Sequence, residues 1–383
     1  MRRVACALAI SLLALASPSE AAAQAMDVVE PYKVGTFEIA GEPTVSLVLR
    51  DRLIVGIEAA NRALEMDPTY ARMPMPADML GLIGQYEYGL KYRLYEIVND
   101  LVGNNRLAGA GRAAYVHDLG DVRTLAPILY PGKVLNAAGN FYSHVGEGGG
   151  AANQQATADA RRENRGVPYL FLKPTRGAIV GNGTPITIPY GRDRIDWEVE
   201  IGTVIGRAAK YVQSADAEAH VFGYMVTIDV SDRGGRPPGN RDTGGDWYVG
   251  KGHDTFAPQG PWIVPKEFYG NPMENLRQTL TVDGRLLQEA RAGDMIHSLW
   301  ELIEYASSIN TLYPGDVVNG GTSGGTGMGV VQTGTAEWLQ AGDVIEATVD
   351  GIGTLRMPVV SEDAPPGPVG VRLPPVNSYR PIS

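Results

Sequence analysis

The chain has 383 residues with a formal net charge of −10, and 44% of its residues are hydrophobic. This composition is typical of a globular protein with a large core, and an acidic chain without a basic block is a poor nucleic-acid binder. The 48 glycines and 26 prolines, with only 8% aromatic residues, favour a turn-rich, mainly β protein over a helical bundle.

The first 24 residues have the layout of a secretory signal peptide. Arg2 and Arg3 form a basic start, an apolar run extends over residues 4–16, and small residues follow. The apolar run is shorter than the roughly 20 residues that span a bilayer. An uncleaved anchor or a misassigned start codon is the alternative. We therefore expect residues 1–24 to be removed, leaving a secreted or periplasmic protein without a membrane segment.

The only cysteine, Cys6, lies inside this predicted signal peptide. The mature chain would therefore carry no thiol. This excludes disulfides, thiolate metal sites and a cysteine nucleophile.

The first part of the mature chain alternates strand and helix patterns. Alternating residues at 36–39 and 45–49 predict strands, and two or three strands are expected over residues 32–59. Apolar residues recur at three- and four-residue steps from 77 to 102, which predicts a helix that ends at Asn104 and Asn105. Residues 26–125 are therefore predicted to form a small N-terminal α+β domain.

The rest of the chain reads as a β-rich domain over residues 126–360, followed by a Pro-rich C-terminal tail over 361–383. Short apolar runs are separated by glycine and proline turns, which gives an α+β, mainly β fold class. Residues 148–166 and 234–250 lack a periodic pattern, and we expect them to be mobile loops of the lid or binding type.

A strand with carboxylates on one face is predicted over residues 195–201. Side chains alternate across a strand, so Asp196, Glu198 and Glu200 lie opposite the apolar residues. Two carboxylates at i and i+2 repel each other unless a cation lies between them, and Mg²⁺ or Ca²⁺ prefers such oxygens. The alternative is an amphipathic strand with Glu198 and Glu200 in water.

A second β-rich run, residues 221–231, contains a single charge, Asp229. A carboxylate in such a run is ion-paired, hydrogen-bonded or bound to metal. A purely structural Asp229 is one alternative. Together with Glu198 and Glu200, it instead predicts an all-carboxylate Mg²⁺ site with positions left for water and substrate.

These motifs resemble the fumarylacetoacetate hydrolase superfamily. The Asp-aromatic-Glu-Val-Glu-Ile pattern resembles its metal-binding strand, and the remaining motifs follow in the family's order over about residues 126–358. They are Gly139–Glu147, Phe171–Pro174, Gly223–Ser231, Lys251–Pro258, Leu312–Val317 and Gly321–Thr322.

The resemblance implies a mixed β-sandwich roll, usually in a homodimer, with Mg²⁺, Ca²⁺ or Mn²⁺ held by Glu198, Glu200 and Asp229. Asn140 stands where the fumarylacetoacetase branch has a fourth metal-binding Asp. The chain is therefore similar to the three-carboxylate, acylpyruvase-like branch.

His144 and Glu147 are spaced to share one face of a helical turn. The resemblance assigns this pair to water activation, with Glu147 orienting an imidazole that takes a proton from water. It also assigns Lys251 to stabilising the developing charge. A surface histidine in a glycine-rich loop is the alternative. Because Glu147 leads into residues 148–166, we expect it to lie on a lid that orders with substrate.

Three further residues are predicted to contact substrate. Thr322 matches a family turn that grips the substrate carboxylate, although a tight turn between strands is an equal alternative. Arg233 is retained from the family pattern, while Arg236 replaces a Gln. An extra guanidinium suggests a second carboxylate on the ligand, since it suits bidentate pairing.

The leading functional prediction is a Mg²⁺-dependent hydrolase that cleaves a C–C bond in a small 2-oxo or 1,3-dicarbonyl acid. A decarboxylase, hydratase or isomerase of oxo acids on the same scaffold is the first alternative. A non-catalytic oxo-acid-binding protein is the second, because a fold does not determine a function.

Overall fold

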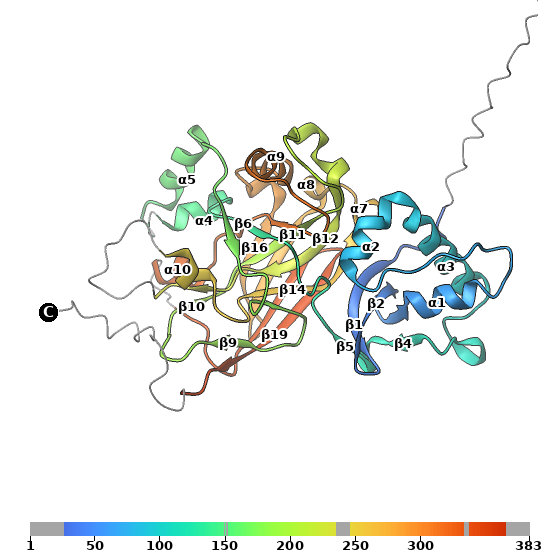
Figure 1. Ribbon diagram of the computed structural model, residues 1–383. Helices are drawn as coiled ribbons and strands as arrows, with labels where there is room; N and C mark the ends of the chain where they lie inside the picture. The colour runs from blue at the N-terminus through green and yellow to red at the C-terminus, as the bar shows by residue number, and fades with distance from the viewer. Residues whose placement is uncertain (1–26, 149, 151, 235–245, 333–336, 365–383) are drawn as a thin grey trace, which may run out of the picture.

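The computed structural model describes residues 27–364, except residues 149, 151, 235–245 and 333–336 (Figure 1). The predicted signal peptide, Arg236 and most of the predicted C-terminal tail lie outside the described residues, so the predictions about them stay predictions. Within the described part of the chain, no helix combines the length and apolar character needed to cross a membrane.

The N-terminal part contains the strands that the alternation predicted, followed by helices. Its elements are β1 (Lys33–Ile39), β2 (Glu42–Leu49), β3 (Leu53–Gly56), α1 (Ile57–Leu64), α2 (Met79–Gln85), α3 (Lys91–Gly103), β4 (Val116–Asp118) and β5 (Arg123–Thr124). The helix predicted over 77–102 is interrupted by a π-helical turn over Tyr86–Leu90, where Gly89 has a φ of 117° that other residues rarely adopt. Its end near Asn104 is confirmed. Helix α1 was not predicted.

One 12-stranded sheet runs through the molecule in the order β4-β3-β2-β1-β14-β12-β11-β17-β6-β7, with β5 on β1 and β8 on β14. Its remaining strands are β6 (Val134–Ala137), β7 (Leu170–Lys173), β8 (Ile179–Val180), β11 (Val199–Ile205), β12 (Val221–Ile228), β14 (Ala257–Pro265) and β17 (Val317–Asn319). The N-terminal strands join it where Val34 of β1 pairs with Ile263 of β14. The predicted boundary near residue 125 is therefore crossed by a continuous sheet, and whether the two parts fold separately stays a prediction.

A five-stranded sheet, in the order β16-β15-β18-β19-β9, packs against the middle of the large sheet (Figure 1). Its strands are β9 (Ile186–Ile188), β15 (Arg277–Val282), β16 (Arg285–Arg291), β18 (Val344–Val349) and β19 (Gly353–Ser361). Both sheets are mixed, because β17 pairs in parallel with β6 in the large sheet and β19 pairs in parallel with β9 in the small one. The α+β, mainly β class is confirmed.

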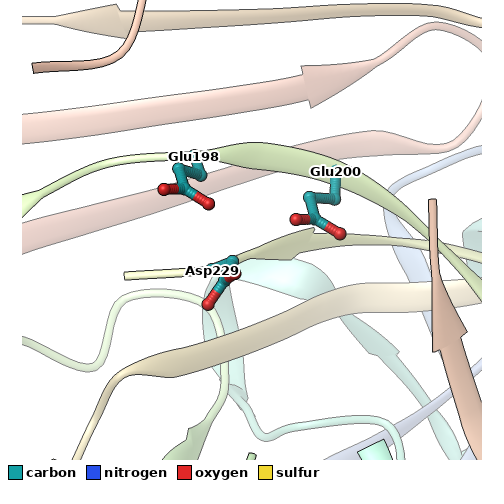
Figure 2. A group of neighbouring side chains, drawn as sticks. All are labelled: Glu198, Glu200 and Asp229. Carbon is teal, nitrogen blue, oxygen red and sulfur yellow. The ribbon is translucent and has the colours of Figure 1, made fainter. Parts of the chain in front are cut away.

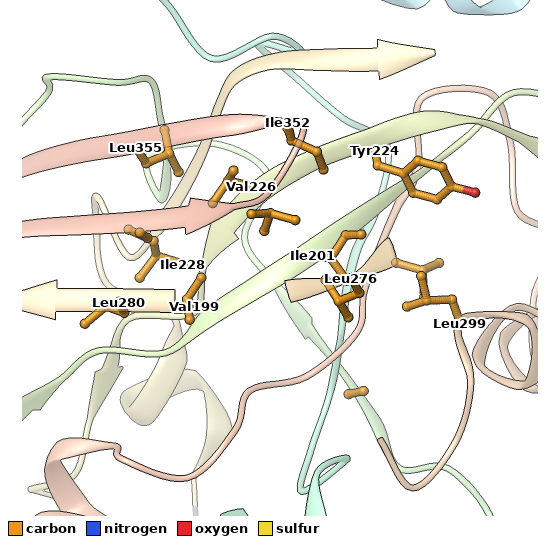
Figure 3. Close-up of a cluster of buried hydrophobic side chains, with 14 of the residues drawn as sticks. Val199, Ile201, Tyr224, Val226, Ile228, Leu276, Leu280, Leu299, Ile352 and Leu355 are labelled. Atoms are coloured by element: carbon orange, nitrogen blue, oxygen red, sulfur yellow. The ribbon is translucent and has the colours of Figure 1, made fainter. Parts of the chain in front are cut away.

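The main hydrophobic core lies between these two sheets. Val199 and Ile201 of β11 and Ile228 of β12 pack with Leu280 of β15 and Leu355 of β19 (Figure 3). All five are at most 1% exposed. Side chains alternate along β11, so the residues on either side of Ile201 point to the opposite face of the large sheet. The carboxylate of Glu200 therefore lies on that opposite face.

The remaining helices flank the sheets. They are α4 (Tyr142–Glu147), α5 (Gln154–Glu163), α6 (Trp247–Lys251), α7 (Lys266–Tyr269), α8 (Pro272–Asn275), α9 (Leu299–Ile309) and α10 (Gly327–Gln332). The prediction of a structureless loop over 148–166 is wrong, because α5 occupies ten of these residues. Only Ala158 of α5 is buried, so the helix carries no apolar stripe that a search for periodicity would detect.

Truncation of Leu355 tests the core between the sheets. We expect Leu355→Ala to lower the free energy of unfolding by about 2–5 kcal/mol, because the substitution leaves a cavity among packed side chains. The matched control is Leu286→Ala, at a leucine that is 53% exposed, with an expected change within about 0.5 kcal/mol. Chemical denaturation followed by circular dichroism measures both, and equal losses would contradict this packing.

Candidate active site

The first two carboxylates come from the start of β11. The predicted continuous strand over 195–201 is wrong at one point, because the structure has β10 (Ile195–Asp196) and β11 with Trp197 and Glu198 between them. The break arises because β10 pairs with β13 (Ser231–Asp232), whereas β11 pairs with β12. Glu198 and Glu200 are 4% and 1% exposed, which excludes the alternative of a solvated glutamate face.

The third carboxylate, Asp229, follows β12, the neighbour of β11. Its backbone N–H donates to the Glu198 carbonyl at 2.8 Å, which ties the two chain segments together. Figure 2 shows Glu198, Glu200 and Asp229 converging, and one oxygen from each lies within 4.8 Å of the others. The structure therefore brings the three predicted metal ligands together, all of them buried.

Three cations surround these carboxylates. Lys251, at the end of α6, donates to Glu198 Oε2 at 3.1 Å and to Asp229 Oδ2 at 2.6 Å. Arg233 donates through Nη2 to Glu198 Oε1. Lys173, the last residue of β7, pairs with Asp229 and donates to the Val230 carbonyl at 2.8 Å. Lys173 lies in one of the motifs of the family resemblance, but it was not predicted as a site residue, because a single lysine at a strand end carries no signal by itself.

The charges are unevenly compensated. Burial alone would raise the pKa of Glu198, but Lys251 and Arg233 outweigh it and hold that pKa at about 2. Burial, reinforced by the charges of Asp229 and Glu198, raises the pKa of Glu200 well above its usual range. Glu200 accepts a hydrogen bond from Gly321 N at 2.9 Å, and in the described part of the chain it has no salt bridge. Glu200 is thus the carboxylate whose charge lacks a counter-ion.

The Lys173 ammonium is the other unbalanced group. Burial lowers its pKa to about 8, although Asp229 acts in the opposite direction. For Lys251 the opposite holds, because Asp229 and Glu198 outweigh burial and raise its pKa. Both lysines are at most 4% exposed.

The predicted dyad forms on helix α4. His144 Nδ1 lies 2.9 Å from Glu147 Oε2, as their three-residue spacing predicted. Glu147 is 6% exposed. Its Oε1 accepts from Gly325 N at 2.5 Å, and its Oε2 accepts from the Thr326 hydroxyl at 3.1 Å. The carboxylate is therefore held from two sides, which fixes the imidazole that it contacts.

A small cavity of about 50 Å³ connects the dyad with the carboxylate cluster. The cavity is lined by six of the described residues that were predicted for the site: His144, Glu198, Asp229, Arg233, Lys251 and Thr322. Phe171 and Trp247, stacked with ring centroids 4.6 Å apart, form part of its wall. Glu147 and Glu200 are not among the lining residues. The predicted residues that the structure describes thus belong to one place, while their individual roles stay predictions.

Thr322 and Asn140 have structural contacts in this site. The Thr322 hydroxyl donates to the Val199 carbonyl at 2.9 Å and accepts from Gln288 Nε2 at 2.8 Å. Asn140 bonds both the N–H and the carbonyl of His297, at 2.9 Å each, and the Gly320 carbonyl at 2.8 Å. Asn140 therefore anchors the loop that carries Gly321, whose N–H bonds Glu200.

The family model for the C-terminal domain of fumarylacetoacetate (FAA) hydrolases matches residues 133–360. The chain belongs to the fumarylacetoacetate hydrolase family. Among curated relatives of this family, protein Rv2993c of Mycobacterium tuberculosis is 38% identical over 247 residues, covering 64% of this chain and 82% of the relative.

Solved structures of the fumarylacetoacetate hydrolase family share this fold. A 5-carboxymethyl-2-hydroxymuconate delta-isomerase from Mycobacterium smegmatis is 35% identical, with a TM-score of 0.52 over 66% of this chain and 87% of that one. The maleylpyruvate hydrolase from Sphingobium sp. SYK-6, solved with manganese(II) and pyruvate, is 26% identical, with a TM-score of 0.62 over 86% of this chain and 100% of that one. The family thus includes hydrolases and isomerases of oxo acids.

The donor set fits a hard divalent cation. Glu198, Glu200 and Asp229 offer only carboxylate oxygens, which Mg²⁺, Mn²⁺ and Ca²⁺ prefer. Burial of Glu200 next to two other carboxylates without a salt bridge is unfavourable unless a cation balances the charge. The residues present therefore suit a metal of this class.

Substitution of Glu200 tests this fit. We expect Glu200→Gln to weaken Mn²⁺ binding by more than the roughly 10–100-fold typical of losing an outer-shell partner. We also expect the melting temperature of the metal-free protein to rise, because one repelling charge is removed. Isothermal titration and thermal denaturation measure the two effects. Glu58→Gln, at an exposed glutamate of α1, is the control, and equal Mn²⁺ affinity in both variants would exclude Glu200 as a ligand.

Proposed function

We propose that this protein is a divalent-metal-dependent hydrolase that cleaves a C–C bond in a small 2-oxo or 1,3-dicarbonyl acid of the acylpyruvate type. The observation that carries this proposal is a single cavity lined by His144, which is paired with Glu147, and by Glu198 and Asp229 of the carboxylate cluster. The maleylpyruvate hydrolase of similar fold, solved with manganese(II) and pyruvate, supports the same metal and product class.

Metal binding would fall to Glu198, Glu200 and Asp229, with Mg²⁺ as the proposed ion and Mn²⁺ or Ca²⁺ as substitutes. When bound, the cation supplies Lewis-acid polarisation of the substrate carboxylate and 2-oxo oxygens. Magnesium activates water far less than zinc does, so a general base in the protein is needed.

His144 would be that base. Its Nδ1 is engaged by Glu147, which leaves Nε2 to take a proton from water. The resulting hydroxide attacks the distal carbonyl carbon, and the bond between that carbon and the methylene carbon breaks. The electron pair passes to the methylene carbon as the enolate of a 2-oxo acid. Protonation of the enolate gives pyruvate when the substrate is an acylpyruvate, and the other product is a carboxylate.

The cations at the site would hold the negative charge of the substrate and of the enolate. Lys251 lines the cavity and is buried, so its charge acts in a medium of low dielectric constant. Arg233 also lines the cavity, with its guanidinium oriented by ion pairs to Asp196 and Glu198. We propose that Arg233, Arg236 and Thr322 contact the substrate, with Arg236 favouring a second carboxylate.

An isomerase is the second candidate. It is favoured by the 35% identity to the 5-carboxymethyl-2-hydroxymuconate delta-isomerase, which exceeds the identity to the maleylpyruvate hydrolase. An isomerase needs proton transfer but no water attack. Product analysis separates the two, because only hydrolysis releases two acids.

We also propose that the chain is exported after removal of residues 1–24 and forms a homodimer. The first proposal rests on the order of basic, apolar and small residues at the N-terminus. Mass spectrometry of the mature protein and light scattering test them.

Turnover of a simple acylpyruvate tests the main proposal. We expect pyruvate release that requires Mg²⁺ or Mn²⁺ and stops with EDTA. In His144→Asn, kcat should fall by about 10²–10⁴-fold, the usual contribution of a general base, with little change in KM. His220→Asn, at a histidine outside the site, should leave kcat unchanged. Metal binding without pyruvate release would favour the isomerase, and equal kcat in both histidine variants would exclude His144 as the base.

A further inference from the structure

One buried carboxylate at the site has no part in the chemistry above. Asp196 is 0% exposed and lies two residues before Glu198. Its Oδ1 accepts from Gly327 N at 2.5 Å, and its Oδ2 accepts from Met328 N at 3.2 Å and from Arg233 Nε at 3.0 Å. Asp196 therefore joins two parts of the molecule, the guanidinium of Arg233 and the first turn of α10.

The guanidinium leads to the carboxylate cluster. Arg233 donates through Nε to Asp196 and through Nη2 to Glu198 Oε1. Because the guanidinium is planar and rigid, fixing Nε on one carboxylate sets where Nη2 meets the other. Asp196 thereby orients the partner of a proposed metal ligand.

The first turn of α10 leads to the dyad. Thr326, directly before Gly327, donates its hydroxyl to Glu147 Oε2 at 3.1 Å and accepts from Gly329 N at 3.1 Å. Gly325 N donates to the other oxygen of Glu147. The segment that Asp196 binds is thus the segment that holds Glu147.

At two glycines the backbone of this segment lies too close to a carboxylate for a side chain to fit. A Cβ atom on Gly327 would lie 2.9 Å from Asp196 Oδ1, and one on Gly329 would lie 2.0 Å from Glu147 Cδ. The backbone of α10 therefore packs directly against both carboxylates. Only glycine allows such a close approach at these positions.

We propose that Asp196 is a positioning residue that couples the carboxylate cluster to the His144–Glu147 dyad. The contacts run from Glu198 through Arg233, Asp196 and the Gly325–Gly329 segment to Glu147 and His144. Asp196 touches no reacting atom and acts by holding Glu147 in place. The expected kinetic effect of this coupling rests on the proposed hydrolase function. Its effect on the His144 imidazole does not, because that effect exists without metal or substrate.

Asp196→Asn is the first test. The amide keeps the shape but replaces one accepting oxygen with an N–H₂ group that opposes the donors of Arg233 and α10. We expect kcat to fall by about tenfold or more, a part of the roughly 10²–10⁴-fold contribution of a general base, and KM to rise because the amide also perturbs Arg233, a proposed substrate contact.

A spectroscopic signal of His144 gives a second readout, in the metal-free protein without substrate. The chain has only five histidines, so the His144 ring signal in an NMR spectrum can be assigned by its loss in His144→Asn. In Asp196→Asn we expect this signal to move toward its position in Glu147→Gln. Thr326→Val, which removes only the hydroxyl bonded to Glu147, should move it in the same direction.

Asp316→Asn is the matched control. Asp316 is also buried, at 1% exposed, and accepts from two backbone N–H groups, Lys133 N and Tyr313 N at 2.8 Å each, while pairing with the Lys133 ammonium. Among the described residues, none of its side-chain hydrogen bonds or ion pairs joins it to the site. We expect Asp316→Asn to lower the melting temperature, as Asp196→Asn does, but to leave kcat and the His144 signal unchanged.

The double variant decides between coupling and separate effects. If Asp196 acts through Thr326, the loss of kcat in Asp196→Asn/Thr326→Val is smaller than the product of the two single losses. A loss in the double variant equal to the product of the two single losses, or an unmoved His144 signal in Asp196→Asn and Thr326→Val, overturns the proposal. If Asp196→Asn does not fold, an unmoved signal in Thr326→Val overturns it. Absence of turnover in the unmodified protein contradicts only the proposed function, because the signal is measured without it.

Discussion

Burial of several carboxylates where β11 begins and β12 ends, in the interior of the large sheet, is the constraint on which the site depends. Asp196, Glu198, Glu200 and Asp229 are all at most 4% exposed, and the cations next to them are the buried Lys173 and Lys251 and the partly buried Arg233. Removing charges from water is costly unless each is paired and hydrogen-bonded. The four carboxylates outnumber the three cations, and the excess falls on Glu200. A bound divalent cation would correct this imbalance, and it is the ion that the proposed chemistry uses.

The two hydrophobic cores determine where these charges lie. Val199 and Ile201 face the core between the sheets, while Val204 and Met225 belong to the core that includes the N-terminal strands and helices. The large sheet thus has an apolar layer on each side, and Glu200 lies near the start of β11, where it pairs with Thr227 of β12. Glu200 lies in β11, and Glu198 and Asp229 directly adjoin β11 and β12, so paired strands support the cluster. Rigid support is what a metal site and a positioned base both need.

The extent to which the site could be predicted from sequence differs from residue to residue. Alternation and a lone charge indicated Glu198, Glu200 and Asp229, and helical spacing indicated His144 with Glu147, because these signals are local. Alternation placed Asp196 on the carboxylate face but did not indicate its contacts, which join residues up to 132 positions apart. Lys251 and Arg233 were assigned only through the family resemblance, and Lys173 was not predicted as a site residue. The break after Asp196 depends on pairing with β13, and α5 lacks an apolar stripe, so neither could be predicted from local patterns. Arg236 lies outside the described residues, and its role stays a prediction.

Anomalous diffraction from crystals soaked in Mn²⁺ tests the central claim most directly. The account predicts a manganese peak coordinated by one oxygen each of Glu198, Glu200 and Asp229. It also predicts that the Lys251 ammonium is displaced from at least one of the two carboxylates that it contacts here. A peak elsewhere, or no peak with both lysine contacts intact, would show that the carboxylates form a purely structural ion-pair cluster and would contradict the account.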